Sequence, residues 1–363
     1  MNKIIFFSLA LILSCGAQAQ DDKHPVRIAM VGLTHNHALG FLDHLNRHKD
    51  VELAGIVETD PALIERYSKR YNLTPDLFYP SLEDLFAKTK VQAVAAFTSI
   101  YDHKLVVETC AAHGIDVMVE KPLATNMKAA RAIKAAVEKS GIQLVVNYET
   151  TWYPGTQAAY GMVHDEHQIG ELRKIVIHDG HRGPKEIGCP PEFLAWLTDP
   201  VQNGGGAMND FGCYGADLAT WFFDGQRPTS LFAVTQQIKP DVYPKVEDEA
   251  TIVLTYPKSQ AIIQASWNWP FSRKDMELYG RTGYVLVAKP DLLRLRTEKM
   301  PAETEVTLPP NEGPNVDSVA YLAAVERKEI KPSGLSSLAV NMVVVEILDA
   351  ARKSALTGRR IDF

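Results

Sequence analysis

The sequence predicts an α/β plus α+β protein of two domains. The first is a Rossmann-type domain with a doubly wound parallel sheet, and the second is built on an open, mainly antiparallel sheet. Two patterns predict this division. Between residues 24 and 147, short apolar runs alternate with segments of helical spacing, which is typical of parallel βαβ units. Beyond residue 172, most apolar runs follow one another without helices between them, which favours an antiparallel sheet.

In the first domain, strands and helices alternate, and ligands of such sheets bind at the carboxyl ends of the strands. The expected strands are residues 26–31, 51–57, 91–97, 115–119 and 142–147, and the expected helices include residues 38–45, 64–71, 103–113 and 126–139. A capped helix start is expected at residues 81–85. The candidate cofactor contacts lie at or after these strand ends: Gly32, Thr34, His35, Asn36, His37, Glu58, Thr98, Ser99, His103, Glu120 and Lys121.

An acidic residue follows the second expected strand. Glu58 lies a little over 20 positions beyond Gly32, where a carboxylate of a dinucleotide fold accepts hydrogen bonds from the adenosine ribose. A carboxylate there also repels a 2′-phosphate, so the sequence favours NAD over NADP. The alternative is that Glu58 and Asp60 only begin the next helix, with Pro61 in its first turn.

The loop after the first strand departs from the glycine fingerprint G-x-G-x-x-G. It reads Gly32-Leu33-Thr34-His35-Asn36-His37, so only the first glycine is present. Helix N-terminal amides, with Thr34 or Asn36, can still bind phosphate. A strand followed by His-x-His also occurs in metal-dependent amidohydrolase barrels, but the later sequence does not supply the βα units of a barrel. We therefore expect no metal.

The second domain is expected to span residues 148–363. Its expected strands are residues 172–178, 230–237, 250–256, 261–267 and 284–288, and a final helix at 335–357 is expected to pack back against the chain.

Two motifs lie about 90 residues apart. Glu120-Lys121-Pro122 ends a β-rich run, and Gly204-Gly205-Gly206 precedes Asp210, Gly212 and Tyr214. The glycines allow close approach to a ligand, and helical spacing places Asp210 and Tyr214 on one face. Together with the order of elements, these motifs resemble the sugar oxidoreductase family named after glucose-fructose oxidoreductase and inositol dehydrogenase (Gfo/Idh/MocA), over nearly the whole chain.

The resemblance implies that Lys121, Asp210 and Tyr214 form a catalytic triad facing a nicotinamide. We expect Tyr214 to act as acid/base, because a nearby Lys121 ammonium would favour the phenolate, with Asp210 as the orienting group. Asp210 could instead be the base. Further substrate contacts are expected from Trp152, Tyr153, His181 and Arg182 beside Lys121, Asp210 and Tyr214. The family likeness also implies a carbohydrate substrate and a homo-oligomer.

The N-terminus resembles an export signal. Lys3 precedes an apolar run at residues 4–13, and Ala17-Gln18-Ala19 is an A-x-A cleavage signal, so we expect a signal peptide at 1–19 and a bacterial periplasmic location. The run is too short to be a transmembrane segment. The alternative is a lipoprotein anchored through Cys15. The later cysteines, Cys110, Cys189 and Cys213, have no C-x-x-C spacing and are expected to be free thiols.

Charge and motifs leave three hypotheses. The net charge of −6, without a basic stripe, argues against a nucleic-acid partner. The first hypothesis is an exported NAD-dependent oxidoreductase of a sugar, polyol or glycoside with a tightly bound cofactor. The second is an NAD-requiring glycosidase that acts by transient C3 oxidation and elimination. The third is a sugar-binding protein that has lost the dinucleotide, against which the presence of Glu58, Lys121, Asp210 and Tyr214 speaks.

Overall fold

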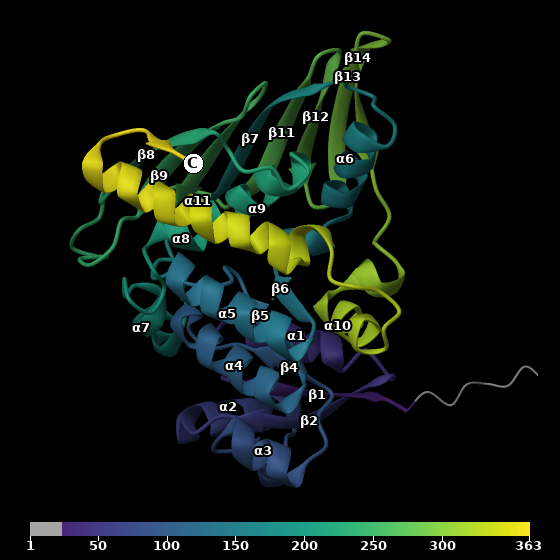
Figure 1. Cartoon of the computed structure of the whole chain (residues 1–363), viewed down its shortest axis with the longest axis vertical. Coiled ribbons are helices and arrows are strands. Elements are labelled where there is room, and N and C mark those ends of the chain that lie inside the picture. The colour runs from purple at the N-terminus through teal and green to yellow at the C-terminus, as the bar shows by residue number, and fades with distance from the viewer. Residues whose placement is uncertain (1–23) are drawn as a thin grey trace, which may run out of the picture.

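The structure is a computed structural model that describes residues 24–363 (Figure 1). The expected signal peptide and Cys15 lie outside the described residues. Two sheets make up the molecule, one parallel and one mainly antiparallel, and they lie one above the other in Figure 1. The predicted fold class is confirmed.

The first sheet is a six-stranded parallel sheet. Its strands are β1 (Val26–Val31), β2 (Val51–Val57), β3 (Phe78–Tyr79), β4 (Ala93–Ala96), β5 (Asp116–Glu120) and β6 (Leu144–Asn147). Their order is β3-β2-β1-β4-β5-β6, and every neighbouring pair is parallel. The chain reverses its direction of winding between β1 and β4, which is where Rossmann sheets bind ligands.

The first domain's helices begin and end at residues that suit those positions. They are α1 (His37–Leu45), α2 (Pro61–Tyr71), α3 (Leu82–Lys88), α4 (His103–His113) and α5 (Met127–Ser140), with short 3-10 turns η1 (Pro75–Leu77) and η2 (Ile100–Asp102). Asp60, Ser81 and Asn126 accept a backbone N–H in the first turns of α2, α3 and α5. Gly114 and Gly141 adopt the left-handed conformation that ends α4 and α5.

The second sheet has nine strands. They are β7 (Leu172–Gly180), β8 (Ser230–Gln236), β9 (Glu249–Thr255), β10 (Gln260–Ser266), β11 (Arg273–Gly280), β12 (Gly283–Lys289), β13 (Leu292–Thr297), β14 (Met300–Thr307) and β15 (Ile361–Asp362). Their order is β14-β13-β12-β11-β7-β10-β9-β8-β15, and only β7 and β10 pair in parallel. The sequence did not predict β11, β13 and β14, because charged residues interrupt their apolar positions.

Some of the second domain's helices pack on one side of this sheet, and others lie against the first domain. They are α6 (Pro154–His164), α7 (Pro191–Leu197), α8 (Ala207–Asp210), α9 (Gly212–Phe222), α10 (Ser318–Glu326) and α11 (Leu338–Thr357), with 3-10 turns η3 (Glu149–Trp152), η4 (Gly313–Val316) and η5 (Gly334–Ser336). The long helix α11 lies along α9 and β8 and also contacts α5 (Figure 1). Helix α10 joins the core of the parallel sheet, since Val319 and Leu322 pack in one cluster with Ile28 and Phe41.

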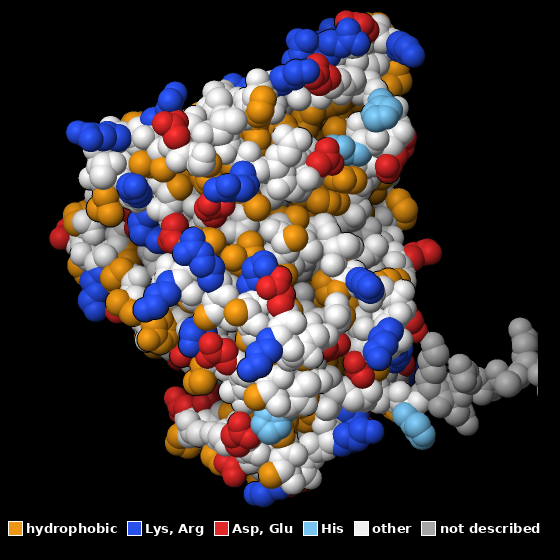
Figure 2. Space-filling model, viewed as in Figure 1, with side chains coloured by type: hydrophobic (Ala, Val, Ile, Leu, Met, Phe, Trp, Pro, Cys, Tyr) orange, Lys and Arg blue, Asp and Glu red, His pale blue; other side chains and the backbone are white. Residues whose placement is uncertain are grey.

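The described surface carries no single strongly charged field in the view shown. Figure 2 shows basic and acidic side chains interspersed over this face. Within residues 24–363, no helix has the length and apolar character needed to cross a membrane. Cys110, Cys189 and Cys213 are free thiols.

Close packing of α9 on the second sheet yields a prediction about stability. A Cβ on Gly215 would overlap the side chain of Ile263 on β10, whereas a Cβ on Gly161 in α6 would lie 3.6 Å from Asp165 Oδ2, an ordinary contact. We expect Gly215→Ala to reduce the free energy of unfolding by about 1–3 kcal/mol. Gly161→Ala should leave it unchanged or raise it by about 0.5–1 kcal/mol. Urea denaturation of both variants measures the difference, and equal effects would contradict the packing described.

Candidate functional site

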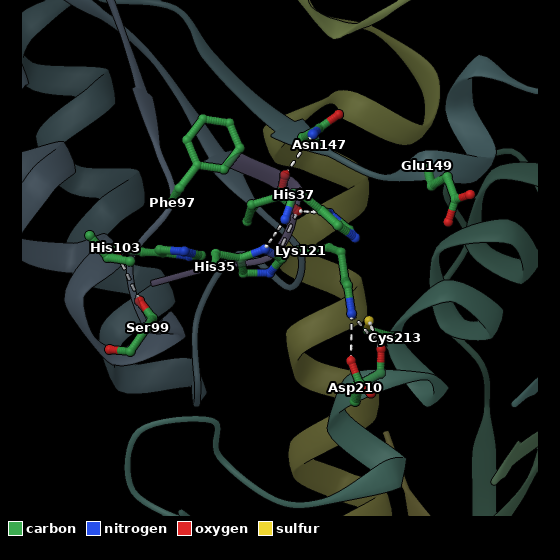
Figure 3. Close-up of polar contacts among 12 residues, drawn as sticks. His35, His37, Phe97, Ser99, His103, Lys121, Asn147, Glu149, Asp210 and Cys213 are labelled. Carbon is green, nitrogen blue, oxygen red and sulfur yellow. Dashed lines mark hydrogen bonds and ion pairs between the residues drawn. The ribbon is translucent and has the colours of Figure 1, made fainter. Parts of the chain in front are cut away.

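A buried ion pair joins the two domains. Lys121 follows β5 and Asp210 ends α8, and Lys121 Nζ lies 2.7 Å from Asp210 Oδ1 and 2.9 Å from the Asp210 carbonyl oxygen (Figure 3). Both residues are 6% exposed. The pair therefore brings together the two motifs that lie far apart in the sequence.

The glycine run allows α8 to approach the first domain. Gly204 has φ +87°, and a Cβ on it would lie 2.9 Å from the Thr125 carbonyl oxygen. A Cβ on Gly206 would overlap the Glu247 carbonyl oxygen. A side chain on Gly204 would push this segment, and with it Asp210, away from Thr125 and the first domain. A side chain on Gly206 would instead displace α8 from the segment before β9.

Asp210 is held as an ionised acceptor. Its Oδ2 accepts a hydrogen bond of 3.0 Å from Trp267 Nε1, and its carbonyl oxygen also accepts one of 3.2 Å from Cys213 Sγ. Burial would raise the pKa of Asp210, but the Lys121 ammonium and its hydrogen bond hold that pKa below the usual value. Asp210 is thus a weak proton acceptor, and it fixes the position of the amine.

Tyr214 lies beside the pair, but in an arrangement different from the one expected. Lys121 Nζ lies 4.9 Å from the centroid of the Tyr214 ring, and Lys274 Nζ lies 4.1 Å from it. Both ammonium groups interact with the ring face rather than with the phenol oxygen. Burial, followed by the charges of Glu149 and Asp179, raises the pKa of Tyr214 well above 10.0. The structure removes the reason we gave for a phenolate, and an acid/base role for Tyr214 stays a prediction.

Sequence reasoning missed a second group of charges around Lys274. Lys274 Nζ lies 2.7 Å from Glu149 Oε2, and Glu149 Oε1 accepts a hydrogen bond of 2.6 Å from the Tyr153 hydroxyl. Burial would raise the pKa of Glu149, but the Lys274 charge lowers it to about 2. Lys274 stands opposite Asp179 in the β7–β11 pairing. Only this strand register brings Lys274 to the site, and no pattern of apolar residues indicated β11.

Asp179 is a buried carboxyl group without a hydrogen bond at one oxygen. It is 2% exposed, and its Oδ2 has no hydrogen-bond partner in the described chain, with Lys274 Nζ 3.9 Å away. Burial raises the pKa of Asp179 to about 8, although Lys274 and Lys121 act in the opposite direction. Near neutral pH this group therefore carries a proton for much of the time.

On the other side of Lys121, the expected cofactor residues His35, His37 and Glu120 form a hydrogen-bonded cluster. His37 Nδ1 lies 2.9 Å from Glu120 Oε2, and Asn147 Nδ2 donates to Glu120 Oε1 at 2.7 Å (Figure 3). Trp152 Nε1 in turn donates to Asn147 Oδ1 at 2.9 Å. Burial would raise the pKa of Glu120, but His37 and His35 lower it to about 2.

The same three side chains could be taken for a metal centre, because their ligand atoms lie within 4.8 Å of one another. The hydrogen bonding favours another interpretation. The His37 backbone N–H donates to His35 Nδ1 at 3.1 Å, so a neutral His35 carries its proton on Nε2, on the side of Glu120. Burial lowers the pKa of His35 well below 6.5, which keeps it neutral. His35 Nε2 then has no lone pair for a metal, so we assign hydrogen-bonding roles to this cluster.

The residues around the loop fit a dinucleotide. Gly32 has φ +78°, and a Cβ there would lie 2.8 Å from Thr98 Cγ2. The backbone N–H groups of Thr34 and Asn36 have no hydrogen-bond partner within residues 24–363 and remain available to a phosphate. The Glu58 carboxylate accepts hydrogen bonds from the backbone N–H groups of Leu33, Thr59 and Asp60, at 2.8–3.0 Å.

Two buried polar atoms near the loop also lack partners in the described part of the chain. They are His103 Nε2 and Trp196 Nε1. The Trp196 ring on α7 stacks on His35 with the ring centroids 5.3 Å apart, so the second domain borders the loop. Sequence reasoning did not single out Trp196.

The remaining expected contacts lie partly at the end of β4 and partly in the second domain. Thr98 Oγ1 donates to the Ser99 carbonyl, Ser99 Oγ bonds Asp102, and His103 Nδ1 lies 3.2 Å from the Leu123 carbonyl oxygen, so these residues also shape the strand end. His181 packs on Phe211 with the ring centroids 4.8 Å apart.

Arg182 is the expected substrate contact that the structure does not bring to the cluster. Its side chain is exposed, and its carbonyl oxygen accepts a hydrogen bond of 2.6 Å from Lys239 Nζ.

The fold and this inter-domain site define a two-domain oxidoreductase of the dinucleotide-binding class. Residues 26–148 match the family model described as "Oxidoreductase family, NAD-binding Rossmann fold", and residues 159–286 match "GFO/IDH/MocA C-terminal domain". These matches cover more than half of the chain. The chain therefore belongs to the Gfo/Idh/MocA family of oxidoreductases.

Dehydrogenases of named activity resemble this chain at low sequence identity. Trans-1,2-dihydrobenzene-1,2-diol dehydrogenase of Sus scrofa is 21% identical over 315 residues, which cover 84% of this chain and 88% of that protein. D-apiose dehydrogenase of Paraburkholderia graminis is 26% identical over 251 residues, 66% of this chain and 60% of that protein.

Solved structures share the fold. The aldose-aldose oxidoreductase of Caulobacter crescentus, complexed with glycerol, has a TM-score of 0.80 at 20% identity, covering 94% of this chain and 100% of that chain. An inositol dehydrogenase homolog of Azotobacter vinelandii, complexed with NAD+, has a TM-score of 0.79 at 18% identity, covering 94% and 98%.

The raised pKa of Asp179 predicts a pH dependence of stability. Between its ordinary pKa of 3.8 and its folded value of about 8, the unfolded chain releases this proton while the folded protein retains it. Rising pH in this window therefore costs stability, by up to about 1.4 kcal/mol per pH unit. Asp179→Asn removes this pH-dependent contribution to the free energy of unfolding. The wild type should therefore lose stability relative to the variant from about pH 5 to about pH 8. Denaturant titrations at several pH values test this, and a constant difference would contradict the assignment.

Proposed function

We propose that the protein is an exported, NAD-dependent oxidoreductase that transfers hydride between a carbohydrate hydroxyl carbon and a tightly bound nicotinamide. The observation that carries the proposal is the Lys121–Asp210 pair, 2.7 Å between Nζ and Oδ1, at the carboxyl edge of the dinucleotide-type sheet. The relatives named above as dehydrogenases of a diol and of apiose support a polyhydroxylated substrate.

The nicotinamide, when bound, supplies the hydride acceptor. Lys121 donates hydrogen bonds and stabilises negative charge that develops on the substrate oxygen. Asp210 keeps the amine charged and oriented. Burial lowers the pKa of Lys121, but Asp210 more than compensates, so its net pKa lies above the usual 10.5.

The charges of the site suit a neutral substrate. Lys121 pairs with Asp210 and Lys274 pairs with Glu149, so each ammonium has its own carboxylate. An anionic substrate would have to compete with these carboxylates, whereas sugar hydroxyls can donate to them and accept from the amines. Glu58 beyond β2 supports NAD rather than NADP, because a carboxylate there repels a 2′-phosphate.

Export is proposed from the N-terminal signal alone. Lys3, the apolar run at 4–13 and Ala17-Gln18-Ala19 support cleavage and a periplasmic location, with lipidation at Cys15 as the alternative. Since free NAD is scarce outside the cytoplasm, such an enzyme would hold its cofactor tightly and recycle it with a second substrate.

We also propose that a second copy of the chain covers the outer face of the nine-stranded sheet. Exposed apolar side chains lie on this sheet, among them Phe232 and Val234 of β8 and Tyr279 of β11. An apolar sheet face of this kind is a common dimer contact.

Nucleotide release and turnover test the function. Freshly purified protein should release NAD on heating, detected by mass spectrometry, and added sugars should change the absorbance of reduced nicotinamide. Lys121→Met should lower kcat by about 10²–10³-fold, the size of effect seen when one transition-state donor is lost. Lys128→Met, on the exposed face of α5, serves as the matched control and should keep its activity.

Three results would count against this function. Protein that carries no nucleotide and shows no saturable NAD(H) binding would contradict it, as would full turnover by Lys121→Met. Release of nitrophenol from a nitrophenyl glycoside without net NADH would replace it with the elimination route.

A further inference from the structure

The 2.7 Å contact between Lys121 and Asp210 depends on how the two segments that carry these residues are held together. Lys121 lies in the segment between β5 and α5 of the first domain, and Asp210 ends the short helix α8. A misplacement of about 1 Å can cost an enzyme about 10²-fold in rate, even when its cause lies far from the chemistry. A side chain that fixes the distance between these two segments therefore positions the amine for the proposed reaction.

Helix α11 supplies two side chains that contact both segments. This long helix packs along α9 and β8 and also contacts α5 (Figure 1). Asp349 and Arg352 stand three positions apart on α11, so they lie on one face of the helix. Arg352 Nη1 donates to Asp349 Oδ1 at 2.6 Å, and both side chains are partly buried. The two residues therefore act as one paired unit.

Asp349 binds the start of α5 in the first domain. Its Oδ2 accepts a hydrogen bond of 2.7 Å from the backbone N–H of Met127, the first residue of α5. The first N–H groups of a helix have no partner within the helix, and they carry partial positive charge, so a carboxylate is favourable there. The Asn126 side chain already accepts the Ala129 N–H, so Asp349 adds a second acceptor, which comes from the other domain.

Arg352 extends from the same face of α11 to both motif segments. Its Nη2 lies 3.3 Å from the Thr125 carbonyl oxygen and 3.4 Å from Asn209 Oδ1. Thr125 follows Lys121 by four residues, and Asn209 is the residue before Asp210. One guanidinium group thus bridges the backbone that follows the first motif and the side chain that adjoins the aspartate of the second.

Asn209 passes this contact on to α8, because both ends of its amide are bound. Its Nδ2 donates to the Asn203 carbonyl oxygen, and the residue has no exposed surface. The Asn203 side chain in turn donates to the Gly205 carbonyl oxygen at 2.7 Å, which closes the glycine turn before α8. A shift of the Arg352 guanidinium would therefore move α8, and Asp210 with it.

We propose that Asp349 and Arg352 are positioning residues, which set the distance across the buried ion pair between the two domains. Their role in catalysis rests on the proposed oxidoreductase function, whereas their effect on the ion pair does not. Asp349 fixes the start of α5, and Arg352 fixes the backbone and side chain beside the two motifs. Without them the two segments separate, and Lys121 loses part of its contact with the carboxylate that orients its amine.

The test compares two arginines that bind the same helix. Arg352→Gln removes the bridging guanidinium, and Arg352→Lys keeps the charge without the planar fork of donors. Arg227→Gln is the matched control. Arg227 pairs with Glu346 of α11, at 2.7 Å between Nε and Oε2, and this pair lies within the second domain. The control therefore removes an ion pair of α11 and leaves the contacts with the first domain in place.

The first measurement concerns the ion pair and needs no substrate. Urea denaturation of a double-mutant cycle with Lys121→Met and Asp210→Asn gives the coupling free energy of the pair. In the Arg352→Gln background this coupling should become clearly smaller, whereas in the Arg227→Gln background it should equal the wild-type value. A loss of general stability alone would leave the coupling unchanged. Equal coupling in all three backgrounds would therefore overturn the proposal.

The second measurement is turnover of a sugar that the wild type oxidises. Arg352→Gln should lower kcat by about 10–10²-fold with KM changed only a few-fold, because the displaced amine loses the alignment that the transition state requires. Arg352→Lys should recover part of the rate, since an ammonium can still donate to the Thr125 carbonyl oxygen. Arg227→Gln should keep the wild-type kcat.

The outcomes separate this inference from the function on which it rests. A wild type without NAD-dependent turnover would overturn the proposed function, and a reduced coupling in Arg352→Gln would still support the positioning role. An active wild type whose Arg352→Gln variant keeps both its kcat and its coupling would overturn the positioning role alone. If Arg352→Gln does not fold, Asp349→Asn, which keeps a side-chain oxygen for the α5 N–H group, is measured in the same two ways.

Discussion

The site depends on one buried ion pair across the domain boundary. Lys121 and Asp210 are both 6% exposed, and each would be costly to bury alone. The amine is held charged by Asp210, which α8 brings to it, and this segment can approach the first domain because Gly204 leaves room for the Thr125 backbone. The relative position of the two domains and the charge state of the site are therefore set by the same contact.

The charged side chains of the site form separate pairs. Lys121 and Lys274 each have a carboxylate and both lie against the Tyr214 ring, so this region stabilises negative charge on a substrate oxygen. On the other side of Lys121, His37 and Glu120 form a separate pair, with 2.9 Å between Nδ1 and Oε2.

Local signals predicted much of the first domain. Capping residues such as Asp60, Ser81 and Gly114 stand where the helices begin or end, and apolar runs indicated the parallel strands. The two family motifs identified Lys121 and Asp210 as site residues, and the fold brings these two residues together. The sequence did not predict that Lys274 and Trp196 belong to the site. The position of Lys274 depends on the β7–β11 register, and that of Trp196 depends on the packing of α7 against the loop. The Tyr214 phenolate was inferred from residue types, without the burial that raises its pKa.

The most direct test of the account is a double-mutant cycle on Lys121 and Asp210. The free energy of unfolding would be measured for the wild type, Lys121→Met, Asp210→Asn and the double variant. Since each single change leaves a buried partner unpaired, Lys121→Met should cost about 3–5 kcal/mol. The double variant should cost clearly less than the sum of the single variants, by about 2 kcal/mol or more. Additive effects within about 0.5 kcal/mol would show that the two groups do not interact, and would contradict the site described.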